Sequence, residues 1–230
     1  MSGLPWLKGQ TKEFALSSLG PKILCTTHNS QLSPLDLEAR KFLDSALDIR
    51  KHLIELNKKK PHERLRKKKY QIDGRLLERW MFKFLIGISC EGQGIIWHES
   101  KLPALSPPKV LLEGVFGLAE FPPPIGLYFS NAIDEHVRFE ESQGAILHLE
   151  THINPDSQGL ASAELLFNGL GFYLLATSDL GKFGRVQLSS GRDVSIKDLV
   201  YHPNNIQLNS FRSSFVAASI DFDWESNVSC

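Results

Sequence analysis

The 230-residue chain has little cysteine, no long apolar run and no excess of charge of either sign. Its three cysteines, Cys25, Cys90 and Cys230, are too few for a disulfide framework, which indicates a reducing compartment. No apolar stretch reaches the roughly 18–20 residues of a membrane span, and residues 1–6 lack the pattern of a signal peptide. We therefore expect a cytoplasmic protein with no membrane partner.

The balance of charge excludes a uniformly basic nucleic-acid binder, because Lys and Arg together number 26 and so do Asp and Glu. The charges are unevenly placed, however. Residues 1–101 carry a net charge of +8, and residues 102–230 carry a net charge of −8. Such asymmetry indicates either two parts with different partners or two halves that dock on each other, and the sequence leaves both open.

Helices are predicted for the first half of the chain. Ser33 as N-cap and Pro34 at the first turn predict a helix start, with Leu32 and Leu37 flanking it as a hydrophobic staple. Apolar residues then follow at alternating spacings of four and three, which predicts about six helical turns. These positions are Leu35, Ala39, Phe42, Ala46, Ile49, Leu53 and Leu56. A second long helix is predicted over about residues 74–90, and a shorter one from Pro107 to about Glu120.

After Ile125 the pattern changes to short segments rich in β-branched and aromatic residues, separated by Gly, Asn, Asp and Pro. Asn168 and Gly169 predict a hairpin turn between two of these segments. The sequence therefore predicts an α+β fold, with two long helices and one short helix followed by a mainly antiparallel β part. We expect an irregular segment over residues 1–32, a helical region over 33–121 with a basic loop at 58–69, and a β-rich domain over 125–230.

A Cys-x-x-His pair, Cys25 and His28, lies in the N-terminal segment. Two residues between the ligands allow both side chains to approach one zinc ion, but two ligands make only half of a tetrahedral site. No second pair of this kind follows, so a buried free cysteine beside a polar turn is the alternative.

The stretch from Leu24 to Ala39, LCTTHNSQLSPLDLEA, resembles the second zinc knuckle and following helix of bacterial HNH-endonuclease-like proteins of unknown role. The resemblance implies that Cys25 and His28 are structural zinc ligands and that residues 1–32 are the remnant of a zinc-knuckle module. It also implies that Asn29 is the asparagine of the ββα-metal motif, which orients the general-base histidine.

The pattern of that family is incomplete here, because no cysteine and no histidine precede Cys25. The first knuckle and the catalytic histidine are absent from this chain, which leaves the hydrolytic mechanism without its general base and its metal. We therefore expect a catalytically incomplete chain, as in an N-terminally shortened member of the family.

The basic run, residues 58–69, has the sequence KKKPHERLRKKK. Clustered cations bind phosphates with release of counterions, so the run is a candidate contact to DNA or RNA. The residues concerned are Lys58, Lys59, Lys60, Arg64, Arg66, Lys67, Lys68 and Lys69. A solvated loop and docking onto the acidic half of the same chain are the alternatives.

A third pattern is His148, Glu150 and His152, which share one face of a predicted strand. Two imidazoles and a carboxylate suit a metal-dependent hydrolase, whereas alternate polar residues also suit a solvent-facing strand.

The leading hypothesis from the sequence as a whole is a nucleic-acid-associated protein related to HNH nucleases. A non-enzymatic module, whose acidic part contacts a basic protein, is the alternative.

Overall fold

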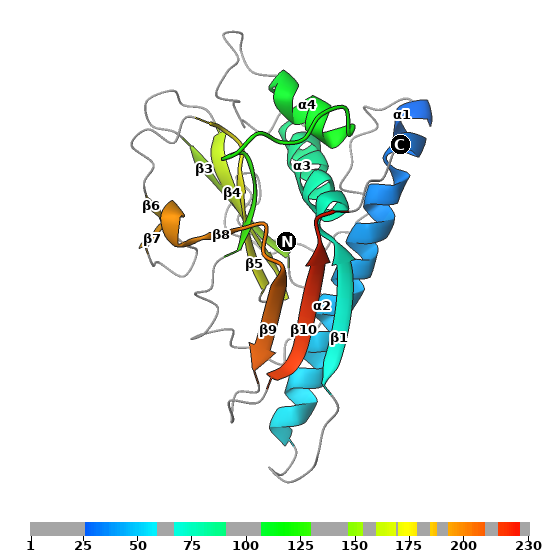
Figure 1. Ribbon diagram of the computed structural model, residues 1–230, viewed down its shortest axis with the longest axis vertical. Helices are drawn as coiled ribbons and strands as arrows, with labels where there is room; N and C mark the ends of the chain where they lie inside the picture. Colours follow the sequence, from blue (N-terminus) through cyan, green and yellow to red (C-terminus); the bar gives the residue numbers. More distant parts are fainter. Residues whose placement is uncertain are drawn as a thin grey trace.

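The computed structural model describes residues 26–58, 67–90, 107–129, 147–153, 160–168, 170–178, 185–187, 193–209 and 216–225 (Figure 1). Helices predominate in the first part of these ranges and strands in the second, so the protein has the predicted α+β fold. In the described residues, no helix combines the length and the apolar character needed to cross a membrane.

Helix α2, Ser33–Lys58, confirms the predicted six-turn helix, and α3, Gly74–Cys90, confirms the second. All seven apolar positions predicted for α2 are buried. The predicted irregular segment 1–32 contains a short helix, α1, Thr26–Gln31, and residues 1–25 lie outside the described ranges. Helix α4, Lys109–Val115, ends before the predicted Glu120.

Two details of the start of α2 differ from the prediction. The Ser33 hydroxyl donates to the Ser30 carbonyl oxygen at 2.8 Å, because α1 precedes α2 directly and supplies that acceptor. Leu32 is buried, but Leu37 is 71% exposed, so the predicted staple between the two leucines is wrong.

The larger sheet contains five antiparallel strands in the order β3-β4-β5-β2-β8. Its strands are β2, Gly126–Phe129; β3, Leu147–Ile153; β4, Leu160–Phe167; β5, Leu170–Leu175; and β8, Val200–Tyr201. The predicted hairpin at Asn168 is confirmed, since β4 and β5 pair with Phe167 opposite Leu170 and Asn168 has φ of 50°. A separate two-stranded ladder joins β6, Arg185–Gln187, to β7, Asp193–Ser195, which leads into the 3-10 turn Ile196–Asp198.

The smaller sheet has the order β1-β10-β9, with β1 at Lys68–Asp73, β9 at Asn205–Asn209 and β10 at Val216–Asp223. Strand β1 pairs in parallel with β10, with Lys69 opposite Ser219. The prediction of a loop through Lys69 is therefore wrong at its end. The strand forms there because a partner from the C-terminal end of the chain supplies its hydrogen bonds, which is a nonlocal contact.

One hydrophobic core joins α2 and α3 to both sheets. The Phe42 ring of α2 meets the rings of Phe167 and Phe172 edge-on, each at 5.5 Å between centroids. Helix α2 packs against α3 and against β1 (Figure 1). The +8 and −8 parts of the sequence are thus in contact, through packing in the core and through the pairing of β1 with β10.

Candidate functional site

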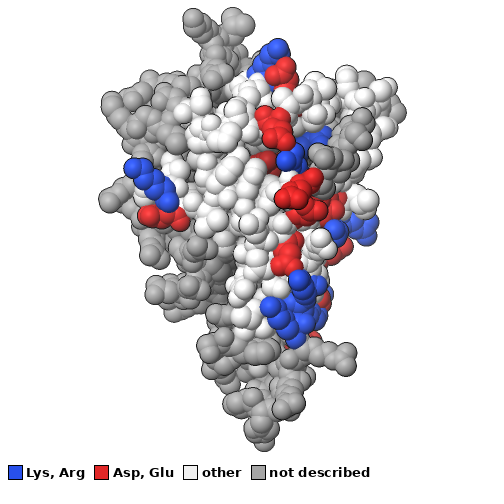
Figure 2. All heavy atoms as spheres, in the orientation of Figure 1, with Lys and Arg blue, Asp and Glu red and all other residues white. Residues whose placement is uncertain are grey.

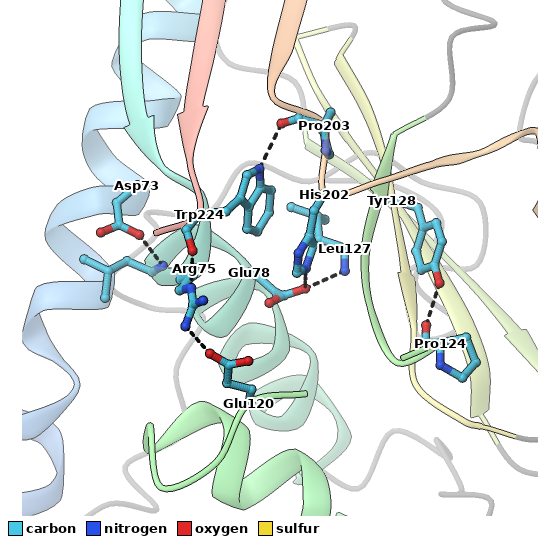
Figure 3. A network of polar contacts seen from close by, with 11 residues as sticks. Asp73, Arg75, Glu78, Glu120, Pro124, Leu127, Tyr128, His202, Pro203 and Trp224 are labelled. Carbon is cyan, nitrogen blue, oxygen red and sulfur yellow. Dashed lines mark hydrogen bonds and ion pairs between the residues drawn. The ribbon is translucent and has the colours of Figure 1, made fainter. Parts of the chain in front are cut away.

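A buried carboxylate and a histidine meet where α3 faces both sheets (Figure 3). The Glu78 side chain on α3 is 6% exposed, and the His202 side chain, between β8 and β9, is 28% exposed. Glu78 Oε1 accepts the backbone N–H of Leu127 at 2.7 Å and lies 2.8 Å from His202 Nε2. The backbone N–H of His202 also donates to the carbonyl oxygen of Leu127 at 3.1 Å. These bonds fix the imidazole between α3 and β2.

Two aromatic rings cover the faces of the His202 imidazole. The Tyr201 ring stacks on one face at 3.8 Å between centroids and 16° between planes, and the Trp224 ring stacks at 3.9 Å and 7°. The Trp224 indole N–H donates to the carbonyl oxygen of Pro203 at 3.0 Å (Figure 3). The exposed part of the imidazole is therefore its edge.

Glycines stand at both ends of this three-ring stack. A Cβ atom at Gly74, the first residue of α3, would lie 2.6 Å from the Trp224 ring. A Cβ atom at Gly126, the first residue of β2, would lie 2.7 Å from the Tyr201 ring and 2.8 Å from Glu78 Oε1. Gly126 also has φ of +149°, which side chains rarely adopt. The stack depends on these two close approaches of backbone to ring.

Polar groups extend the cluster around Trp224. Arg75 donates from Nε to the Trp224 carbonyl oxygen and forms an ion pair with Glu120 (Figure 3). His202 has φ of +46°, and such backbone conformations in residues other than glycine concentrate at turns and functional sites. Among the described residues, no group of three His, Cys, Asp or Glu side chains is placed to hold a metal ion. Glu78 lies on α3, Tyr201 on β8 of the larger sheet and Trp224 directly after β10 of the smaller sheet, so the cluster connects the helix to both sheets.

Tyr201 titrates differently from a free tyrosine because of its place in this cluster. Burial, and then the nearby Glu78 carboxylate, raise its pKa to about 12. The Tyr128 ring lies 5.0 Å from the Tyr201 ring, and burial raises the pKa of Tyr128 as well. A raised pKa means that the stability from the neutral Tyr201 phenol is present below pH 10 and is lost as the pH rises through about 12.

The titration of Tyr201 is directly measurable. The difference in tyrosinate absorbance between the native protein and a Tyr201→Phe variant isolates this one phenol. We expect the midpoint of that difference near pH 12, because the native cluster disfavours the phenolate. A midpoint near pH 10, the value of a free tyrosine, would contradict the burial of the Tyr201 phenol in this cluster.

A groove lies between α2 and β1. It consists of two adjoining hollows of about 530 and 540 Å³, which share Lys41, Ser45 and Tyr70. The first hollow is also lined by Leu37, Arg40, Asp44 and Asp48, and the second by Lys69, Gln71, Ile72, Asp73 and Asp223. The lining includes three cations, Arg40, Lys41 and Lys69, and four aspartates, so the groove itself has no excess of positive charge.

The basic end of β1 is tied to carboxylates on both sides. Lys68 Nζ lies 2.6 Å from Asp48 Oδ2 on α2, to which the Tyr70 hydroxyl also donates, and Lys69 Nζ lies 2.7 Å from Asp221 Oδ2 on β10. The hydrogen bond from Lys68, and then that from Tyr70, lower the pKa of Asp48, while burial raises the pKa of Tyr70. The Lys69 hydrogen bond likewise lowers the pKa of Asp221. In Figure 2, blue side chains gather over the start of β1 and red ones lie farther along the strand, toward α3.

The eight cations of the basic run are described only in part. Lys58 is the last residue of α2, Lys67 is exposed, and Lys68 and Lys69 begin β1. Lys59, Lys60, Arg64 and Arg66 lie outside the described residues. The described residues of the run therefore lie at the end of α2 and at the start of β1, which are both at the lower end of the view in Figure 1. Lys69 contacts the acidic half, as one alternative predicted.

The predicted zinc ligands are described only in part. Cys25 lies outside the described residues, as does the side chain of Asn29. His28 lies on α1 and is exposed, and its ring meets the Phe116 ring edge-on at 5.5 Å. A zinc site at Cys25 and His28 and the role of Asn29 therefore stay predictions.

The three predicted metal ligands His148, Glu150 and His152 lie on β3, as expected. The structure does not describe the side chains of His148 and Glu150. Leu149, between them, is fully buried, which fits the predicted alternation of apolar and polar faces. His152 is half-buried. Its use in a metal-dependent hydrolase stays a prediction.

Comparisons with known proteins found no matching family model, no matching curated protein and no matching solved structure. The Glu78–His202 cluster was not among the sites predicted from the sequence, since the two residues are 124 positions apart. The sequence carried one signal, because Glu78 precedes the apolar Phe82 and Leu85 by four and seven positions and so shares their side of α3. In the structure both of these side chains are fully buried.

Proposed function

We propose that this chain associates with nucleic acid through its basic run, residues 58–69, and carries no complete nuclease site of its own. The observation that supports the proposal most is where the run lies. Its described ends, at the last residue of α2 and the first residues of β1, lie at one end of the molecule (Figure 1), and twelve consecutive residues hold its eight cations. Cations concentrated in this way attract phosphates far more strongly than the same charges spread over a neutral surface.

Two cations of the run, Lys68 and Lys69, are engaged in ion pairs within the fold. Lys68 and Lys69 must give up, or share, contacts of 2.6 and 2.7 Å with Asp48 and Asp221 before they bind a phosphate. We therefore expect Lys68 and Lys69 to contribute less to phosphate binding than the other cations of the run, which are Lys58, Lys59, Lys60, Arg64, Arg66 and Lys67. Zinc at Cys25 and His28 belongs to the same proposal as a structural ion, on the resemblance to HNH proteins.

Two matched double variants test the proposal, each of which removes two positive charges. In about 0.1 M salt each phosphate contact contributes close to a factor of ten in affinity. We expect K59Q/K60Q to weaken binding of a single-stranded or duplex oligonucleotide about 10- to 50-fold, and K68Q/K69Q to weaken it less than about fivefold. Fluorescence anisotropy of a labelled oligonucleotide measures both. Equal, negligible effects of the two variants would remove the basic run from the interface.

A further inference from the structure

Strand β1 is the edge of the smaller sheet within the described residues, since β10 is its one neighbour in that sheet. Alternate residues of a strand direct their backbone groups to opposite edges. The N–H of Asp73 donates to Glu38 Oε1 on α2 at 2.8 Å, so this N–H does not point to β10. Lys69 and Gln71, four and two positions earlier, therefore direct their backbone groups to the same open side.

The walls of the groove beside this edge have a defined chemistry. Lys69 lies at one end of the outward face of β1, where its side chain is 69% exposed even though it pairs with Asp221, so a peptide carboxylate can share it. Asp73 lies at the other end, in register with Asp223 of β10, so two negative charges share that end, although Asp73 Oδ1 also accepts the backbone N–H of Leu76. On the side of α2, the Tyr70 ring and the exposed Leu37 side chain share the first hollow. The groove thus offers a cation, a carboxylate pair and an apolar wall along one strand edge.

We propose that the groove between α2 and β1 binds an extended peptide segment of a partner protein as an added antiparallel strand. The backbone groups of Gln71 and Lys69 pair with the peptide, as in other complexes that add a strand to a sheet edge. In an antiparallel pair, residues that lie opposite each other have side chains on the same face of the sheet. A matching peptide therefore has the order basic, apolar, polar, apolar, acidic. Its basic residue lies opposite Asp73 and its acidic residue lies opposite Lys69.

Charge favours a peptide over a nucleic acid in this groove, because its four carboxylates outnumber its three cations and carboxylates repel phosphates. A peptide strand also fits better than the β1 edge of a second copy. Helix α2 flanks the open edge, so a second copy would bring its own α2 against the first (Figure 1). This proposal shares Lys69 with the basic run, but it is argued from the groove and the strand edge and not from the charge of the run.

The test uses the whole chain and two labelled peptides that share one central sequence. The first centres on Lys-Val-Thr-Val-Glu, and the second exchanges the Lys and the Glu, so that like charges face each other in the antiparallel register. We expect the first peptide to bind at least about tenfold more tightly, as measured by fluorescence anisotropy. Equal affinities, or tighter binding of the second peptide, would overturn the proposed register.

Two variants of the chain show where the peptide binds. Gln71→Pro removes a backbone donor at the open edge, a position at which edge strands tolerate proline, and should weaken binding at least about tenfold. Gln71→Thr keeps that donor and should bind as the native chain does, with circular dichroism reporting the fold of both. Leu37→Ser, on the opposite wall, should weaken binding about three- to tenfold. If none of these changes alters affinity, or if an oligonucleotide displaces the peptide, the groove is not a peptide site.

Discussion

Replacing Glu78 by alanine is expected to lower the free energy of unfolding by about 3 kcal/mol, because two hydrogen-bond donors lose their common acceptor. The Leu127 N–H belongs to a fully buried residue and has its bond to Glu78 Oε1 at 2.7 Å. His202 Nε2 loses its bond at 2.8 Å while its ring stays between Tyr201 and Trp224. Urea unfolding followed by circular dichroism measures the loss.

Two control variants separate the hydrogen bonds from the charge. Glu78→Gln keeps an oxygen that can accept the Leu127 N–H, so we expect it to destabilise the protein by about 1–2 kcal/mol. Glu120→Gln removes a carboxylate whose side chain is 77% exposed, and such surface changes usually stay within about 0.5 kcal/mol. A Glu78→Ala variant as stable as Glu120→Gln would show that Glu78 is not the buried acceptor described above.

Replacing all eight cations of the basic run by glutamine is expected to weaken nucleic-acid binding about 1,000-fold or more in 0.1 M salt. This loss of affinity corresponds to four or more phosphate contacts, each of which contributes close to a factor of ten in 0.1 M salt. The net charge of the chain changes from 0 to −8 at the same time. Anisotropy titrations with a labelled oligonucleotide measure the change.

The matched control for this prediction keeps the run and removes cations elsewhere. Arg40 and Lys109 have side chains that are 81% and 87% exposed, and each pairs with a carboxylate on its own helix. R40Q/K109Q should change the affinity for the oligonucleotide less than about threefold. If this variant and the eight-residue variant weaken binding to the same degree, the interaction does not depend on the run.

The helices were predictable because their burial follows local periodicity. The spacing of residues from Leu35 to Leu56 places one stripe of α2 in the core, and burial of that stripe needs no knowledge of the partner. Strand β1 was not predictable in the same way. Its sequence, KKYQID, contains two lysines and few β-branched residues, and it becomes a strand because β10, from the other end of the chain, pairs with it. Nonlocal pairing overrides local composition there.

In the candidate sites, too, some features are visible in the sequence and others depend on contacts between distant parts of the chain. The charge of the basic run is visible in the sequence, but the pairing of Lys68 with Asp48 and of Lys69 with Asp221 depends on the fold. The stack of Tyr201, His202 and Trp224 joins a turn to the end of a strand, and the backbone conformation of His202 has no sequence signature. Gly74 and Gly126 could be read as turn glycines, and their contacts with ring atoms appear only in three dimensions.

The most direct test of the proposed function is the salt dependence of oligonucleotide binding by the unmodified chain. Each phosphate contact contributes about −0.9 to the slope of log K against log salt concentration for duplex DNA, and about −0.7 for single strands. With four or more contacts from the basic run, we predict a slope of about −3 or steeper between roughly 50 and 200 mM salt. Absence of binding at 50 mM salt, or a slope close to zero, would contradict the proposal that this chain associates with nucleic acid through residues 58–69.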